Sequence, residues 1–241
     1  MSSVKAINEA VDQKLKTNNA TDDVIVDAPE CCSDHSCESK AMDNLDNMSD
    51  IMTTNTRPSR AEAEEAVRTL IKWAGDDPTR PGMIETPARV TKAYEEFFAG
   101  YRQNAEDELS KTFEDIVGYD DFVLVKNIDF TSHCEHHIVP IIGRAHVAYW
   151  PDQKIVGISK LARIVDIYAK RMVSQENMTR QIAGVIDDVL QPKGVTVVID
   201  AVHHCMSTRG VGKAGSSTVT SMYTGIFKED PAIKDRLLRA I

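Results

Sequence analysis

The stretch FVLVKNIDFTSHCEHHIVPIIGRAHVAYW, residues 122–150, contains both the strand pattern that decides the fold and a concentration of metal-binding side chains. Its two ends, Phe122–Phe130 and Ala145–Trp150, are rich in β-branched and aromatic residues and are bounded by turn residues, which is typical of strands. Gly194–Val202 has the same character. The sequence therefore predicts three strands, with Cys and His side chains between the first two.

Helices are predicted on both sides of these strands in the sequence. Ser59, with Glu62 three residues later, forms a capping box for the first helix, and Thr86 followed by Pro87 begins the second. Periodic apolar residues predict two more helices, over Ser159–Arg171 and Gln175–Leu190. A strand at about Ser217–Phe227 and a short helix capped by Asp230 and Pro231 follow. This order indicates an α+β fold with a largely antiparallel sheet.

The chain divides into a tail and a folded domain. Residues 1–56 contain no Phe, Trp or Tyr and are rich in Asp, Asn, Ser and Thr. Such a segment buries too little apolar area to offset chain entropy, so we expect disorder there and one catalytic domain over residues 57–241. The tail also contains Cys31, Cys32, His35 and Cys37. The three cysteines are interpreted as incidental thiols of a flexible tail. Adventitious metal binding by this Cys/His group, or oxidation of the thiols, is the alternative.

Composition restricts the partners and the compartment. The net charge of −9 and the pI of about 5.3 argue against general nucleic-acid binding and leave only a local basic cluster for a phosphate group. No run approaches the roughly 18 apolar residues of a membrane helix, and the N-terminus lacks the apolar core of a secretory signal. Five cysteines, unevenly placed, do not form a disulfide framework. We expect no nucleic-acid or membrane partner and a reducing, cytoplasmic location.

A split set of metal ligands is the main chemical signal. Cys134 and His137 have Cys-x-x-His spacing, and Cys205 is predicted to end the strand that begins at Gly194. Neighbouring strand ends can bring these segments together, so we predict that the three residues bind one metal ion. Two thiolates and one imidazole leave one tetrahedral position open, as in catalytic zinc sites that use a bound water. In the alternative interpretation, both cysteines are small buried hydrophobes and the histidines are satisfied polar groups.

Five histidines lie in these two segments, more than one metal ion needs. His136 and His203, each close to a predicted ligand, are candidates for proton transfer because imidazole titrates near neutral pH. His133 is a rival ligand candidate. His204 is interpreted as structural, and His146 as a half-buried or surface residue within a strand.

A basic cluster accompanies the predicted ligands. Lys160 and Arg163 lie three residues apart on one face at the start of a predicted helix, whose N-terminus attracts anions. Arg209 follows Cys205 by four residues. Taken separately, the Lys160–Arg163 pair and Arg209 are most simply interpreted as solvated basic residues on the surface. Together, beside a predicted metal centre, the three side chains favour an anionic substrate such as a polyphosphate.

Four motifs together resemble the GTP cyclohydrolase I family, in its order and spacing, from about residue 58 onward: ETPxR at 85–89, CEHH at 134–137, GISKxxR at 157–163 and DAVHxC at 200–205. The resemblance implies a tunnelling fold (T-fold), in which an antiparallel sheet carries helices on one side beside an N-terminal helical pair. It also implies a homodecamer of two pentamers with active sites at subunit interfaces.

The resemblance also implies roles for individual residues. It assigns one zinc ion per subunit to Cys134, His137 and Cys205, and the triphosphate of GTP to Lys160, Arg163, Arg209 and a neighbouring subunit's Arg89. Ser159 matches a ribose contact, and Gln175 and Glu176 match positions that read the guanine edge. His203 would protonate the ring nitrogen, His136 would assist later proton transfers, and Glu135 would support the site through a hydrogen bond.

The implied reaction opens the imidazole ring of GTP, releases formate and yields 7,8-dihydroneopterin triphosphate, the first step of folate and pterin biosynthesis. Two other T-fold enzymes are rivals. The nitrile reductase of queuosine synthesis lacks this zinc set, and pyruvoyl-tetrahydropterin synthase binds its metal through three His. An inactive, zinc-stabilised oligomer or binding scaffold is the non-enzymatic alternative. The sequence does not identify a regulatory partner.

Overall fold

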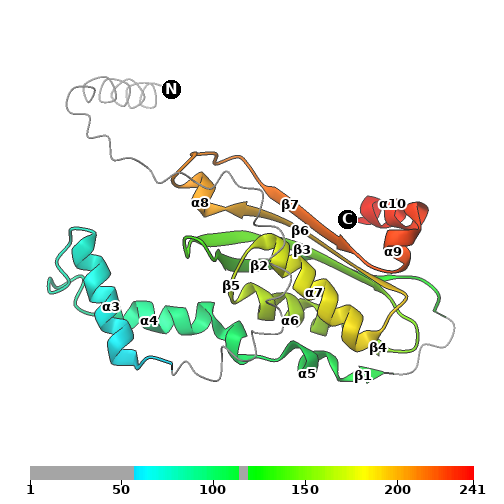
Figure 1. Cartoon of the computed structure of the whole chain (residues 1–241), viewed down its shortest axis with the longest axis horizontal. Helices are drawn as coiled ribbons and strands as arrows, with labels where there is room; N and C mark the ends of the chain where they lie inside the picture. Colours follow the sequence, from blue (N-terminus) through cyan, green and yellow to red (C-terminus); the bar gives the residue numbers. More distant parts are fainter. Residues whose placement is uncertain (1–56, 114–118) are drawn as a thin grey trace, which may run out of the picture. The chain divides into compact units, whose positions relative to one another are not determined.

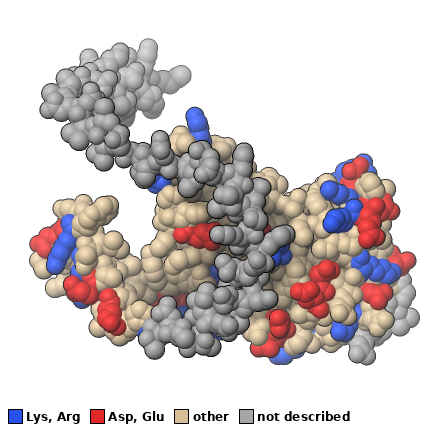
Figure 2. Space-filling view, viewed as in Figure 1, with Lys and Arg blue, Asp and Glu red and all other residues tan. Residues whose placement is uncertain are grey.

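The computed structural model describes residues 57–113 and 119–241 (Figure 1). The predicted disordered tail and its Cys/His cluster lie outside these residues. Within the described part, no helix combines the length and the apolar character that crossing a membrane requires. Positive and negative side chains are interspersed on the part of the face that Figure 2 leaves uncovered.

Two helices begin the described chain. Helix α3, Arg60–Trp73, has the predicted capping box: the Ser59 hydroxyl accepts a bond from the Glu62 amide, and the Glu62 carboxylate accepts one from the Ser59 amide. Helix α4, Thr86–Phe97, begins with Pro87 in its first turn, although Glu85 rather than Thr86 occupies the N-cap position. A short 3-10 helix, η1 (Ala99–Arg102), follows.

A five-stranded sheet forms the centre of the domain, in the order β5-β2-β3-β6-β7. Neighbouring strands are antiparallel except for β2 and β5, which confirms the prediction of a largely antiparallel sheet. Two strands are longer than predicted, because β2 extends to the first metal-ligand candidate and β3 begins directly after the turn. The bounds are β2 Val123–Cys134, β3 Pro140–Trp150, β5 Met172–Val173, β6 Gly194–His203 and β7 Thr218–Tyr223.

The two long helices lie on one face of this sheet, as predicted (Figure 1). Helix α6, Ile158–Ala169, packs on β2, and helix α7, Gln175–Leu190, packs on β6 and β7. The main core lies between these helices and the sheet, where Leu161, Ile164, Met178, Ile182, Ile186, Val147 and Tyr149 are almost fully buried. Apolar burial on this scale is the main source of stability for the domain.

A second, smaller core anchors the C-terminus. Ala148 and Trp150 alternate with the β3 residues of the main core, so they lie on the opposite face of the sheet. Phe227 and Leu237, from helices α9 (Ile226–Glu229) and α10 (Pro231–Ala240), cover them. The predicted strand to residue 227 is wrong in its last part. Gly225 has a φ of 47°, and this turn ends the extended chain before α9.

Short elements complete the domain and were not predicted. Helix α5, Ala105–Leu109, precedes a two-stranded sheet of β1 (Thr112–Phe113) and β4 (Ile155–Val156). Elements of two to five residues have no measurable periodicity, so the sequence pattern does not reveal them.

A close approach at Gly100 connects the N-terminal helices to the core. Its amide donates a hydrogen bond to the Lys170 carbonyl at 3.0 Å, just beyond the end of α6. A Cβ atom at this position would lie 2.0 Å from the Ile167 carbonyl oxygen. Only glycine therefore allows η1 to lie against the end of α6.

We predict that Gly100→Ala lowers the free energy of unfolding by about 1–3 kcal/mol, because the added methyl group forces the backbone apart. Gly184→Ala, in the middle of α7, is the matched control. An added Cβ there meets no atom within 4 Å, so the same change should stabilise the helix by roughly 0.5–1 kcal/mol. Thermal unfolding followed by circular dichroism measures both, and equal midpoints for Gly100→Ala and the unsubstituted protein would contradict the packing argument.

Candidate functional site

A tight turn at the end of β2 positions the first two metal-ligand candidates. The Ile138 amide donates to the Cys134 carbonyl at 2.9 Å, and the Cys134 amide donates to the Val139 carbonyl at 3.0 Å. Ile138 has a φ of 53°, a left-handed conformation that costs a β-branched residue roughly 1–2 kcal/mol. The hydrogen bonds of the turn hold this conformation, and the chain reverses so that His137 lies beside Cys134.

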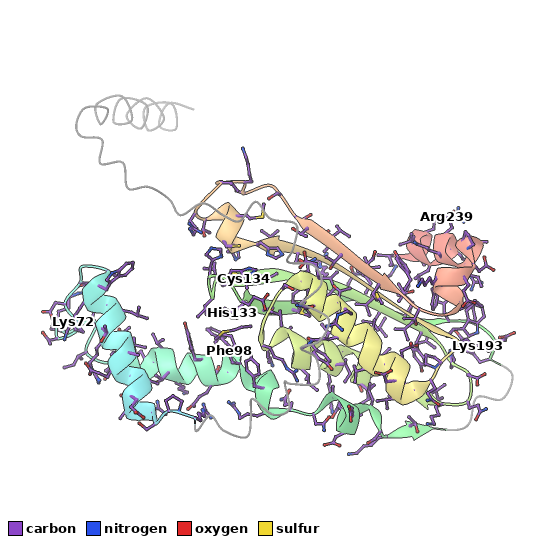
Figure 3. The ribbon with its side chains drawn as sticks, in the orientation of Figure 1. Lys72, Phe98, His133, Cys134, Lys193 and Arg239 are labelled. Carbon is purple, nitrogen blue, oxygen red and sulfur yellow. The ribbon has the colours of Figure 1, made fainter. Side chains whose placement is uncertain are left out.

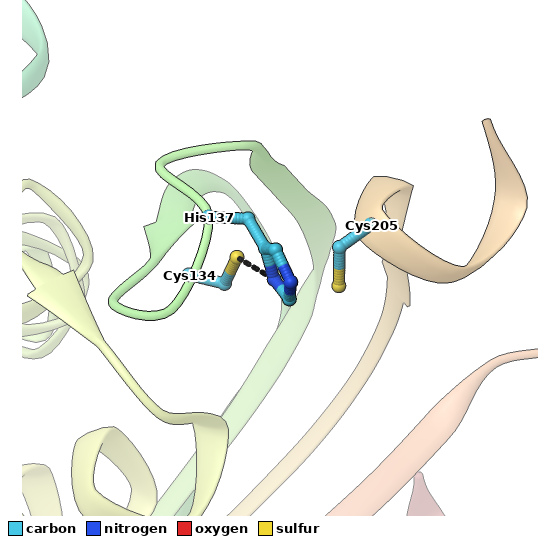
Figure 4. Close-up of side chains that lie close together, drawn as sticks. All are labelled: Cys134, His137 and Cys205. Carbon is cyan, nitrogen blue, oxygen red and sulfur yellow. Dashed lines mark hydrogen bonds between the residues drawn. The ribbon is translucent and has the colours of Figure 1, made fainter. Parts of the chain in front are cut away.

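The three predicted ligands lie together (Figure 4). The Cys134 sulfur is 3.8 Å from His137 Nδ1, and donor atoms of Cys134, His137 and Cys205 all lie within 4.8 Å of one another. The prediction that Cys205 ends a strand is wrong: β6 ends at His203, and Cys205 lies in the short helix α8, His204–Ser207. The helical turn after β6 directs this sulfur toward the other two ligands.

The electrostatics of this cluster suit a cation. Burial raises the pKa of the Cys205 thiol, and the neighbouring Cys134 raises it further. Two thiolates at this separation disfavour each other's charge, and a bound divalent ion would reverse that preference. Two sulfurs and one imidazole nitrogen are also the donor types that zinc prefers. The residues present therefore fit a zinc ion with one open coordination position.

His203 lies at the same end of the sheet, because it pairs with Ile141 at the start of β3. Its Nε2 is 2.8 Å from the Gln175 side-chain oxygen. Burial lowers the pKa of His203, and the exposed carboxylate of Glu176 opposes that shift. His203, Gln175 and Glu176 therefore form one group beside the ligand cluster.

The other histidines differ in exposure. The His136 side chain is 72% exposed, and its Nε2 lies 3.9 Å from the Glu135 carboxylate. His133 is buried against Phe97 and Phe98, as Figure 3 shows for Phe98, and it does not join the ligand cluster. His146 is buried within β3, more deeply than predicted, and accepts a bond from the Asn127 amide.

The basic residues form two groups. Arg209 is exposed in the loop after α8, and its charge acts to lower the pKa of Cys205, so it lies near the ligand cluster. Lys160 and Arg163 instead pair with Glu108 of α5, at 2.6 and 2.8 Å. These two hydrogen bonds lower the pKa of Glu108. Glu108 was not predicted as a partner of these cations, since α5 is too short for its sequence pattern to indicate a helix.

One chain does not bring all the predicted residues together. Lys160 lies in the first turn of α6, whereas the end of α6 leads into β5, which pairs with Cys134. From Lys160 to Ala169 the helix rises by about 14 Å, so this length of α6 separates Lys160 from the ligand cluster. Ser159 is exposed at the same start of α6, and Arg89 pairs with Glu85 on α4.

A cavity of about 500 Å³ lies beside Arg163. Its lining includes Asp107, Glu108 and Asp166 as well as Lys111 and Lys170. Carboxylates and cations are thus mixed along its wall, and the ligand cluster does not contribute to it.

Comparison with known proteins identifies related chains. Residues 63–241 match the family model described as GTP cyclohydrolase I. A GTP cyclohydrolase 1 from Maricaulis maris is 57% identical over 187 residues, covering 78% of this chain and 91% of the relative. One from Sinorhizobium fredii is 57% identical over 185 residues, covering 77% and 90%. A solved structure of the archaeosine synthase QueF-Like overlaps 44% of this chain and 96% of its own, with 17% identity and a TM-score of 0.38, too low to support an argument.

We predict that Cys205→Ser weakens zinc binding by more than about 100-fold. Loss of a direct ligand should exceed the ~10–100-fold effect of removing a residue that only supports a ligand. Zinc content after dialysis against a competing chelator measures the change. Cys37→Ser, which removes a thiol from the N-terminal tail, is the control and should retain about one zinc ion per chain. If the Cys205→Ser variant retained one zinc ion per chain, Cys205 would not be a zinc ligand.

Proposed function

The chain belongs to the GTP cyclohydrolase I family, and we propose that it opens the imidazole ring of GTP at the cluster of Cys134, His137 and Cys205. It is an enzyme of pterin and folate biosynthesis that acts on GTP. The observation that carries the assignment of the site is the convergence of two sulfurs and one imidazole within 4.8 Å, beside His203.

The proposed cofactor is one zinc ion per subunit. Zinc in such a ligand set lowers the pKa of a water ligand to about 7, which supplies a nucleophile for C8 at neutral pH. Cys134, His137 and Cys205 would leave one position open for this purpose. Because thiols must stay reduced to bind zinc, we place the enzyme in the reducing cytoplasm.

We assign the first proton transfer to His203. It is half-buried close to the ligand cluster, where its protonated imidazole can give a proton to the ring nitrogen of guanine as C8 is attacked, which leaves the imidazole neutral. His136 is exposed to solvent and suits the later transfers that follow ring opening. Glu135, 3.9 Å from His136, would hold that imidazole in place through electrostatic attraction.

Glu176 is the proposed guanine-binding residue. Its carboxylate is exposed next to His203 and can accept hydrogen bonds from N1–H and the N2 amino group of guanine. Gln175 was expected from the resemblance to read the same edge. Its side chain is 1% exposed, so it would support the site from within the domain.

The triphosphate would be bound by cations from more than one subunit. Arg209 is near the ligand cluster of its own chain, whereas Lys160 and Arg163, in the first half of α6, both pair with the single carboxylate of Glu108. Phosphate oxygens would replace the Glu108 carboxylate as their partner. Family membership implies an oligomer, and we propose a homodecamer in which these residues, Ser159 and Arg89 complete a neighbouring subunit's site.

Incubation of the purified protein with GTP tests the proposed activity. Formate and a dihydroneopterin product should appear, should disappear after chelation, and should return when zinc is added, because the ligand cluster cannot supply the nucleophile alone. Magnesium added in place of zinc is the control and should not restore the reaction, since it prefers oxygen ligands. A zinc-replete, folded protein that releases no formate would overturn the proposal.

Shared sites predict complementation between inactive subunits. Cys205→Ser and Lys160→Ala should each strongly reduce formate release when every subunit carries the change. In oligomers mixed in equal amounts, about a quarter of the sites would combine an unsubstituted residue from each side, so activity should recover toward that fraction. The control is a chain that carries both substitutions, mixed with either single variant. Mixed oligomers without recovery would place the whole site in one chain.

A further inference from the structure

The side chain of Gln175, the first residue of α7, is buried in a complete set of hydrogen bonds. Its Nε2 lies 3.2 Å from the Ile199 carbonyl oxygen, 2.9 Å from the Thr218 carbonyl oxygen and 3.1 Å from the Thr220 hydroxyl. Its Oε1 lies 2.8 Å from His203 Nε2. The amide therefore connects strands β6 and β7 to the imidazole of His203.

These surroundings allow only one orientation of the amide. Reversing it would place Oε1 at 2.9–3.2 Å from two carbonyl oxygens, neither of which can donate a hydrogen. The amide nitrogen must therefore face the two carbonyls, and Oε1 must face His203. Because a carboxamide oxygen only accepts hydrogen bonds, the hydrogen in this contact belongs to Nε2 of His203.

The neighbouring hydroxyls have a defined hydrogen-bond direction as well. Thr179 donates its single hydroxyl hydrogen to the Gln175 main-chain carbonyl at 2.7 Å. The 2.7 Å contact between Thr179 and Thr220 must then use the hydrogen of Thr220. Thr220 is left as an acceptor for the Gln175 amide, in agreement with its position. The hydroxyl hydrogens of Thr179 and Thr220 thus each have one defined acceptor in this network.

We propose that Gln175 is a positioning residue that holds His203 in the tautomer with hydrogen on Nε2. Nδ1 is then the nitrogen that gives up or accepts the proton exchanged with the substrate, since Nε2 keeps its hydrogen whether the ring is neutral or charged. This inference rests on the proposed role of His203 in ring opening. The same contact argues against a direct role of Gln175 in binding guanine. The guanine edge presents N–H donors, and the only acceptor of the Gln175 side chain, Oε1, already accepts a hydrogen bond from His203.

The kinetic test is Gln175→Met, which has similar length and no hydrogen-bonding amide. Without its partner the imidazole can rotate or change tautomer, so kcat for formate release should fall about 10–100-fold while KM for GTP stays within about two-fold. In a His203→Ala background, Gln175→Met should reduce kcat no further, because its effect acts through that imidazole. A raised KM with unchanged kcat, or an equal loss in both backgrounds, would overturn the proposal.

Thr179→Val is the matched control. It removes both hydrogen bonds of the Thr179 hydroxyl from the same network but leaves the Gln175 side-chain amide and its three acceptors in place. We expect its kcat to stay within about two-fold of the unsubstituted enzyme. Zinc content and thermal unfolding of all variants show whether a loss of activity comes from loss of metal or of structure. A kcat loss in Thr179→Val as large as that of Gln175→Met would overturn the proposal.

A spectroscopic measurement determines the tautomer of His203 in the unsubstituted enzyme. Nitrogen-15 spectra of the histidine-labelled enzyme distinguish protonated from unprotonated ring nitrogens, and His203→Ala identifies the signals. The neutral His203 ring should carry hydrogen on Nε2 and none on Nδ1. The opposite tautomer would overturn the inference even in an active enzyme. Absence of formate release would instead overturn the proposed function, while the tautomer would still be measurable.

Discussion

The position of β3 between β2 and β6 is the constraint on which the metal-ligand cluster depends. Antiparallel pairing on both sides of β3 places the end of β2, the start of β3 and the end of β6 side by side at the same end of the sheet. Cys134 and Cys205, 71 positions apart in the chain, are therefore close neighbours in the fold. Because the side-chain period of a strand is two, a one-residue slip of β2 against β3 would turn Cys134 to the opposite face, and a slip of β6 would displace the helical turn that carries Cys205.

The same architecture separates the two kinds of chemistry that the substrate needs. Sulfur and imidazole donors, with His203 and Glu176, occupy one end of the sheet, whereas Lys160 and Arg163 occupy the start of α6 with Glu108 between them. Carboxylate pairing keeps the two cations from facing each other unscreened. In the proposed homodecamer, assembly of subunits would bring the cationic group of one chain to the metal site of another, without placing both in one small domain.

Local sequence patterns predicted much of the secondary structure and the clustering of the metal-ligand candidates. Capping at Ser59 and Asp230 and the periodicity of α7 predicted helix positions well. Cys-x-x-His spacing and a distant Cys predicted that Cys134, His137 and Cys205 lie together. The predictions failed where tertiary contacts override local preference. The four-residue helix α8 looks like the end of a strand in sequence, and the burial of Gln175 depends on carbonyl groups of β6 and β7, which no motif records.

The left-handed Ile138 has a consequence for how the enzyme acquires its metal. Its unfavourable backbone conformation is adopted when the β2–β3 hairpin folds and is held by the turn's own hydrogen bonds. That cost belongs to folding and does not recur when an ion enters or leaves. In the proposed zinc site, Cys134 and His137 would therefore act as a preorganised bidentate chelator, for which the entropy loss of ring closure has already occurred, and Cys205 would complete a tridentate set.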